Sequence, residues 1–113
     1  MLTRSVGDMM KARVERDPGF ATALFHEAAE NLLNGEPQTA RLMLRELVNA
    51  AVGFETLAAD IHKPSKSLHR MLSTNGNPSM DNLAAILGAI RRRLAAGEPQ
   101  THARDQSAGR PCN

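Results

Sequence analysis

The stretch from residue 63 to residue 79, KPSKSLHRMLSTNGNPS, gathers many side chains that can donate hydrogen bonds. Lysine, serine, histidine and arginine side chains surround Leu68, Met71 and Leu72, whose spacing predicts a short helix buried on one side. Positive and hydroxyl donors on the opposite face would suit a polar, negatively charged partner. The alternative is that they are ordinary solvated residues. Binding of an anion, rather than catalysis, is the chemistry that this stretch supports.

Residues able to carry out catalysis or to hold a metal ion are sparse. The chain contains four histidines, namely His26, His62, His69 and His102. They form no HExxH motif, and the single cysteine, Cys112, can supply neither a zinc set nor an intrachain disulfide. Gly76 stands alone in its loop, so the chain has no glycine-rich phosphate loop. We therefore expect a protein that is not an enzyme and needs no metal or other cofactor.

Positive charge is concentrated in the middle of the chain. Residues 1–38 carry four basic and six acidic side chains, whereas residues 39–95 carry eight basic and four acidic ones. The middle section, which includes residues 63–79, therefore favours a polyanionic partner. Phosphate would be repelled by the acidic residues 1–38, which suggests that they contact protein instead.

The length and composition predict one small all-α domain. A chain of 113 residues can bury a modest core. Its apolar residues are mostly Ala, Leu and Met, and it has three Phe, no Trp and no Tyr. No apolar run approaches the roughly 20 residues of a membrane span, and the N-terminus lacks the apolar stretch of a signal peptide. We expect a cytoplasmic protein with no membrane partner.

Two helices are expected in the N-terminal part. Residues 3–16 can form a short one. Asp17-Pro18 predicts a cap and a first helical residue, and Asn34-Gly35 predicts the end of the same helix. One apolar stripe lies on this second helix, formed by Phe20, Leu24, Phe25, Ala28 and Leu32. The stripe must be buried, either on the chain's own helices or against a partner.

The middle of the chain predicts two short helices between two longer ones. Thr39 is expected to cap a helix that Gly53 ends, and a short helix follows over residues 54–61. The helix of residues 63–79 comes next, and Ser79 is expected to cap a last helix that ends at Gly97. Two short helices joined by so few residues must cross steeply. That is the geometry of a helix-turn-helix, whose second helix can enter the major groove of DNA.

At these residues the sequence resembles the lambda-repressor/Cro-like helix-turn-helix family. The similar segment is GFETLAADIHKPSKSLHRMLSTNGNPSMDNLAAIL. With DPGFATALFHEAAENLLNGEPQTARLMLRELVNA ahead of it, the chain looks more narrowly like the antidote proteins of bacterial toxin–antitoxin modules, over roughly residues 17–94. The resemblance implies a small helical bundle with a lambda-repressor-like helix-turn-helix. It also implies a dimer that binds its own promoter and silences a partner toxin.

The resemblance assigns individual roles within residues 63–79. It places Ser65, Lys66 and Arg70 at base-facing positions, Ser67 at a phosphate-facing position, and His69 where it can reach either. The complete set of candidate DNA-binding residues is Lys63, Ser65, Lys66, Ser67, His69, Arg70, Asn75 and Asn77. Asn75, Gly76 and Asn77 also fit a turn that tolerates positive φ, and their backbone amides could hold a phosphate. Serines near a helix start equally often cap it.

Several residues of the same region have structural alternatives. Leu68 and Met71 fall on the buried anchor positions of the family. Pro64 stands where the family usually has a capping Ser or Thr, so the cap is expected from the Lys63 backbone or from Ser65, and His62 stands where glycine is common. The three consecutive arginines at residues 91–93 are explained either by a favourable interaction with the helix dipole or by phosphate binding.

The sequence thus predicts three regions and one preferred function. They are an N-terminal helical extension for protein contact (1–38), a helix-turn-helix DNA-binding domain (39–96) and a disordered tail (97–113). The preferred function is transcriptional regulation of a double-stranded DNA operator by a homodimer that also neutralises a partner toxin protein. The alternatives are a stand-alone helix-turn-helix regulator and a helical adaptor that binds protein but not DNA.

Overall fold

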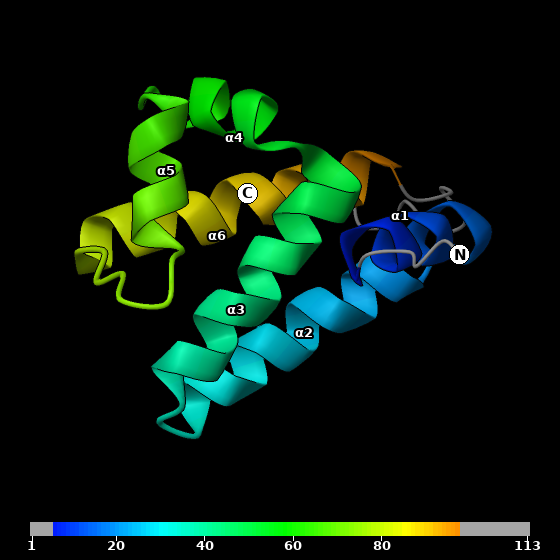
Figure 1. Cartoon of the computed structure of the whole chain (residues 1–113), viewed down its shortest axis with the longest axis horizontal. Coiled ribbons are helices and arrows are strands. Elements are labelled where there is room, and N and C mark those ends of the chain that lie inside the picture. The colour runs from blue at the N-terminus through cyan, green and yellow to red at the C-terminus, as the bar shows by residue number, and fades with distance from the viewer. Residues whose placement is uncertain (1–5, 98–113) are drawn as a thin grey trace, which may run out of the picture.

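The computed structural model describes residues 6–97, and every regular element within them is helical. The elements are α1 (Val6–Arg16), α2 (Phe20–Leu33), α3 (Pro37–Leu47), the π-helical turn η1 (Val48–Val52), α4 (Phe54–Asp60), α5 (Ser65–Met71) and α6 (Met80–Gly97) (Figure 1). The predicted all-α fold is confirmed. Residues 3–5 of the first predicted helix, the predicted disordered tail beyond residue 97, His102 and Cys112 lie outside the described residues.

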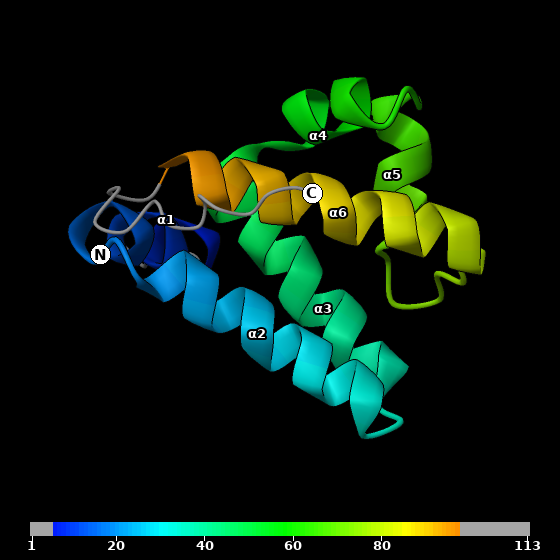
Figure 2. The same cartoon turned by 180° about the vertical axis from the view of Figure 1, so that it is seen from behind.

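Helices α2 and α3 form an antiparallel hairpin (Figures 1 and 2). Helix α2 ends at the position that the sequence predicts. Gly35 has φ +76°, and its N–H donates to the Leu32 carbonyl at 3.1 Å. The Glu36 N–H donates to the Asn31 carbonyl at 2.8 Å. This pair of bonds caps the last carbonyls of α2 around a left-handed glycine, so the predicted stop at Asn34-Gly35 is confirmed.

Both helix starts in this hairpin differ from the prediction. Asp17, Pro18 and Gly19 form a turn between α1 and α2, in which Asp17 Oδ1 accepts the Gly19 N–H at 3.2 Å, and α2 begins only at Phe20. Helix α3 begins at Pro37 rather than after Thr39, with Glu36 as its N-cap. Proline has no N–H to leave unpaired and its φ suits a helix, so it starts the first turn without a side-chain cap.

Helix α3 leaves its regular course through η1 before Gly53. The Gly53 N–H donates to the Val48 carbonyl, five residues back, at 2.6 Å. Gly53 itself has φ +93°, a conformation that glycine adopts without strain. The predicted break at Gly53 is confirmed. The π-helical turn and Gly53 together redirect the chain into α4.

One hydrophobic core joins the N-terminal helices to the rest of the molecule. Fully buried side chains come from α3, η1, α4, α5, α6 and the residue after α5: Leu44, Leu47, Val48, Leu57, Leu68, Leu72, Ile86 and Ile90. Helix α2 adds Ala21, Leu24 and Ala28 to the same core, and Phe20 and Phe25 pack against it. The apolar stripe of α2 is therefore covered largely by the chain's own helices. Leu33, one residue further along, remains 83% exposed.

Helix α6 runs along the length of the molecule, past the α2–α3 hairpin and under α4 and α5 (Figure 2). Its N-cap is Ser79, as predicted: the Ser79 hydroxyl accepts the Asn82 N–H at 3.1 Å, and the Ser79 carbonyl accepts the Leu83 N–H at 2.8 Å. None of the helices within residues 6–97 combines the length and apolar composition needed to cross a membrane.

Candidate nucleic-acid interface

Helices α4 and α5 meet through a turn built on a left-handed residue. His62 has φ +58°, and its N–H donates to the Ala59 carbonyl at 3.2 Å. The Lys63 N–H donates to the Ala58 carbonyl at 3.0 Å, which completes the same glycine-type helix ending that Gly35 makes. His62 thus occupies a conformation that glycine would adopt with less strain. The chain leaves the turn steeply, so α5 lies across the direction of α4 (Figure 1).

Pro64 is the N-cap residue of α5. Its φ and ψ are −64° and +144°, and its carbonyl accepts the Leu68 N–H at 3.2 Å. No side chain donates or accepts a capping bond there, so the expectation of a cap from Ser65 or the Lys63 backbone was wrong. The rigid φ of proline sets the direction in which the chain enters the helix.

The two faces of α5 differ sharply in composition. Leu68 is fully buried, as is Leu72 directly after the helix, whereas Met71 is only partly buried against the core. The prediction of two buried anchors therefore holds for Leu68, and Leu72 rather than Met71 is the second. Because an α-helix repeats every 3.6 residues, Lys66 and Arg70 lie on the side opposite this anchor, and both are exposed.

The candidate DNA-binding residues all reach solvent. Lys63, Lys66, His69, Arg70, Asn75 and Asn77 are exposed, and Ser65 and Ser67 are half-buried at the flanks of α5. Most of them are therefore gathered around one helix and the loop that follows it. The basic residues of this group, Lys63, Lys66 and Arg70, take part in no ion pair within the described part of the chain.

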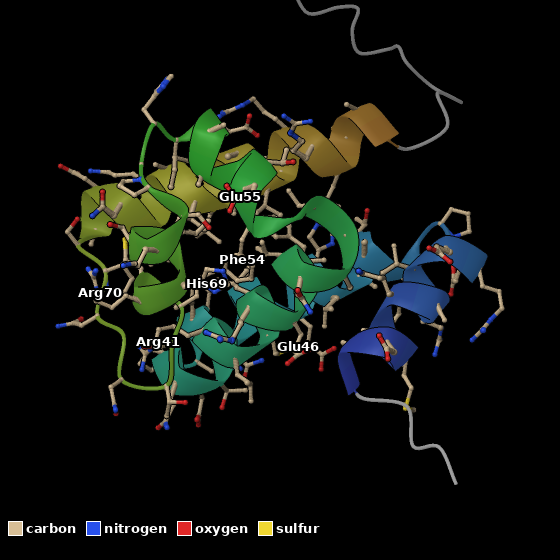
Figure 3. All side chains as sticks on the ribbon, turned by 45° about the horizontal axis from the view of Figure 1, so that its top comes forward. Arg41, Glu46, Phe54, Glu55, His69 and Arg70 are labelled. Atoms are coloured by element: carbon tan, nitrogen blue, oxygen red, sulfur yellow. The ribbon has the colours of Figure 1, made fainter. Side chains whose placement is uncertain are left out.

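His69 is held by an aromatic contact that its neighbours on α5 lack. Its ring stacks on the buried Phe54, at the start of α4, with ring centroids 3.8 Å apart and planes 15° apart. Figure 3 shows His69 beside Phe54, and Arg70 on the other side of α5. Stacking on Phe54 limits the orientations open to the imidazole of His69.

The last turn of α5 and the loop after it are held by two arginines of α3. Arg41 donates from Nε to the Ser73 carbonyl at 3.2 Å and from Nη2 to the Thr74 carbonyl at 3.1 Å. Arg45 donates from Nη1 to the His69 carbonyl at 3.4 Å. The His69 carbonyl lies in the last turn of α5, where helix carbonyls lack intrahelical partners and carry partial negative charge. The Ser73 and Thr74 carbonyls lie in the loop just after the helix.

Gly76 is required in this loop for space rather than for its backbone conformation. Asn75, Gly76 and Asn77 all lack a positive φ, so that part of the prediction was wrong. A Cβ at Gly76 would collide with the Met71 carbonyl oxygen and would lie 2.7 Å from the Arg70 carbonyl oxygen. The Gly76 N–H already donates to the Ser73 carbonyl at 2.9 Å, so it is not free for a phosphate.

One of the three arginines at residues 91–93 of α6 makes an ion pair. Arg93 donates from Nε and Nη2 to the two carboxylate oxygens of Asp60 on α4, at 2.8 and 2.9 Å. That hydrogen-bonded guanidinium lowers the pKa of the Asp60 carboxyl below its ordinary value. Arg91 and Arg92 are exposed. The predicted choice between helix dipole and phosphate omitted the ion pair that Arg93 makes.

Three residues around α5 escaped sequence reasoning. Arg41 and Arg45 counted only as positive charge, and Phe54 was given no role. Their partners lie 15 to 33 residues away, and no local pattern marks such pairs.

Within residues 6–97, no three His, Cys, Asp or Glu side chains come together as a metal site would require.

Comparison of the chain with models of known protein families, with curated proteins and with solved structures gave no match.

Proposed function

We propose that this chain is a DNA-binding transcriptional regulator in which α4 and α5 act as a helix-turn-helix. One observation carries the proposal: Lys66 and Arg70 extend from the face of α5 that lies opposite the buried Leu68 and Leu72. A short helix that is anchored on one side and rich in donors on the other has the form needed to enter a major groove about 12 Å wide.

The exposed residues of α5 suit distinct parts of a DNA site. Arg70 can donate two hydrogen bonds to guanine O6 and N7, the commonest specific contact, and Lys66 can reach a base or a phosphate. Ser67 on the flank, together with Lys63 before the helix, suits the phosphate backbone. His69, whose ring is held on Phe54, reaches the same surface from the other flank. Asn75 and Asn77 extend the interface into the loop.

The proposed protein acts as a homodimer and as an antitoxin. A two-fold operator presents half-sites about one helical turn, roughly 34 Å, apart, and a dimer is needed to read both. The likeness to antidote proteins supports a partner toxin. Residues 1–38 carry two more acidic than basic side chains, which would suit a toxin whose own surface is basic because it grips RNA. Leu33 offers an exposed apolar contact at the tip of the hairpin.

The experiment compares two double variants with the same change in charge. The probes are a duplex selected from a random-sequence library by the wild-type protein, a scrambled duplex, and the DNA directly upstream of the reading frame. Lys66→Ala with Arg70→Ala should weaken binding of the selected duplex by about ten- to several-hundredfold, because it removes base-reading donors. Lys11→Ala with Arg16→Ala, on the distant helix α1 (Figure 1), should leave the affinity nearly unchanged.

Salt titration separates phosphate binding from other modes of association. The logarithm of the association constant should fall linearly with the logarithm of salt concentration, by about 0.9 per phosphate neutralised. Circular dichroism should show the same helix content in both double variants. Equal affinity in the α5 and α1 variants would refute DNA reading by α5 and would favour the protein-binding adaptor. Co-purification with the product of an adjacent small reading frame tests the antitoxin role separately.

A further inference from the structure

We propose that Arg41 is a positioning residue for DNA reading: it holds α5 and residues 73–77 in the arrangement that a specific site requires, and it does not itself bind phosphate. The inference rests on the proposed function and adds to it a residue outside the candidate interface. It rests on the observation that the guanidinium of Arg41 donates to two neighbouring backbone carbonyls, those of Ser73 and Thr74, just after α5.

Arg41 is well suited to hold this loop. The guanidinium offers several N–H donors in a rigid plane, and two of them meet the carbonyls of Ser73 and Thr74 at 3.2 and 3.1 Å. Helix α3 anchors the arginine from behind, since Ala40 and Leu44 beside it are fully buried. The contact therefore ties a rigid helix to a segment that otherwise has no regular structure.

The loop transmits this restraint to α5 through tight contacts. Gly76 lies directly against the carbonyls of Arg70 and Met71, with no room for a Cβ. The Ser73 hydroxyl donates to the Arg70 carbonyl at 2.8 Å, and the Gly76 N–H donates to the Ser73 carbonyl at 2.9 Å. A shift of residues 73–76 would therefore displace the last turn of α5, which carries Arg70, as well as Asn75.

The hydrogen bonds of Arg41 direct two of its donors at backbone carbonyl oxygens, which carry partial negative charge. Its side chain is half-buried, unlike the exposed Lys66 and Arg70. A guanidinium engaged in this way adds little to counterion release, whereas loss of its two bonds would misalign Arg70 against a base. We infer that Arg41 acts on the ratio of specific to non-specific affinity and not on the number of phosphates bound.

The test compares Arg41→Lys and Arg41→Met with the wild-type protein. Lysine keeps the positive charge but places its donors on a single nitrogen, so it cannot reproduce the fork across two carbonyls. Each protein is titrated with the library-selected duplex and with a scrambled duplex of equal length, over a range of salt concentrations. Arg16→Lys and Arg16→Met on α1 serve as matched controls, because Arg16 is an exposed arginine far from α5. All binding is measured well below the melting temperature of each variant.

Both Arg41 variants should lower the ratio of selected to scrambled affinity by about five- to a hundredfold, the range set by one misaligned bidentate base contact. Their affinity for scrambled DNA and their salt slopes should match those of the wild type. Hydrogen exchange at the Gly76 amide, measured without DNA, should quicken in both, because its acceptor, the Ser73 carbonyl, is released. If Arg41→Met does not fold, Arg41→Lys decides the matter alone.

Two outcomes would overturn the positioning role. If Arg41→Lys keeps the wild-type ratio while Arg41→Met lowers the salt slope by about 0.9, Arg41 binds phosphate directly. If both variants keep the ratio and differ only in melting temperature, Arg41 serves stability alone. Failure of the wild-type protein to bind any duplex would instead refute the proposed function, and the positioning role with it.

Discussion

At the scale of single residues, the basic side chains of the middle section divide into those that donate to groups of the chain itself and those that do not. Arg41 and Arg45 donate to carbonyls around the end of α5, and Arg93 donates to Asp60. The cations left to face a partner from α5 and the turn before it are Lys63, Lys66 and Arg70. Net charge counted along the sequence therefore overstates the charge offered to DNA, and the position of each basic residue matters more than their number.

Two glycines give a prediction at this scale. Gly76→Ala should destabilise the protein by about 1–3 kcal/mol, because the new Cβ would press on the Met71 and Arg70 backbone carbonyls, which cannot swing aside as a side chain can. Gly88→Ala should stabilise it by about 0.5–1 kcal/mol, because Gly88 lies inside α6. There the nearest atom to the new Cβ would be Arg92 Nη1, at an ordinary 3.5 Å.

Thermal melting followed by circular dichroism checks this pair. The two variants should move the melting temperature in opposite directions, by several degrees for a domain of this size. A tolerated alanine at residue 76 would mean that the loop does not press against the end of α5, and the link from Arg41 to α5 would lose its basis.

At the scale of elements, α4 and α6 share the hydrophobic core and are also joined by one ion pair, between Asp60 and Arg93. The side chains of Arg93 and Asp60 are 48% and 25% exposed, so the stabilisation is expected to be small. Its value lies in orientation, since a bidentate guanidinium–carboxylate contact restricts how α4 can tilt on α6. The placement of α5 follows from that of α4, because only a short turn joins them.

The pH dependence of this pair is predictable in sign. The pKa of Asp60 is lowered in the folded protein, so the pair contributes to stability above the unfolded carboxyl value, about pH 4. That contribution is lost as the pH falls through the lower folded value. Asp60→Asn should therefore lower the melting temperature by about one to a few degrees at pH 7, and the difference should vanish at the most acid pH values.

A double-mutant cycle with Arg93→Met isolates the pair from other effects of acid. The coupling between the two substitutions should be present at pH 7 and should be lost as the pH falls through the lowered pKa of Asp60. Coupling that persists undiminished in acid would show that the two side chains interact through packing rather than through the charge of the carboxylate.

At the scale of the whole molecule, the acidic N-terminal part and the middle section share one core. Ala21, Leu24 and Ala28 of α2 are buried among side chains of the later helices. Arg13 of α1 covers the ring of Phe20, with its guanidinium carbon 4.6 Å from the ring centre. The division at residue 38 remains a prediction about which surface meets which partner.

A chain beginning at Gln38 tests this interdependence. Removal of residues 1–37 would expose core side chains that α2 now covers. The lost burial costs about 1.5–3 kcal/mol of folding free energy for each large apolar side chain. The total free energy of unfolding of a domain is only about 5–15 kcal/mol. The shortened chain should therefore lack a cooperative melting transition. Leu33→Lys in the full chain is the control, since this exposed residue should leave the melting temperature almost unchanged. Cooperative melting of the shortened chain would mean that α3 to α6 fold alone.

The sequence by itself determined the features that depend on a few neighbouring residues. The ends of α2 and η1 follow from Gly35 and Gly53, which take positive φ without strain, and the start of α6 follows from the Ser79 hydroxyl. The burial of Leu68 follows from helical periodicity. In each case the interaction closes within about five residues, so the pattern can be read without knowing the fold.

Tertiary structure alone decided the features whose partners lie far apart in the chain. Arg41 meets Thr74, Phe54 meets His69, and Asp60 meets Arg93 across 15 to 33 residues. Met71 is only partly buried because Leu72, one position further, takes the deeper place in the core. Which donor meets which acceptor depends on how the helices cross, and that crossing is set by the packing of the whole core rather than by any local pattern.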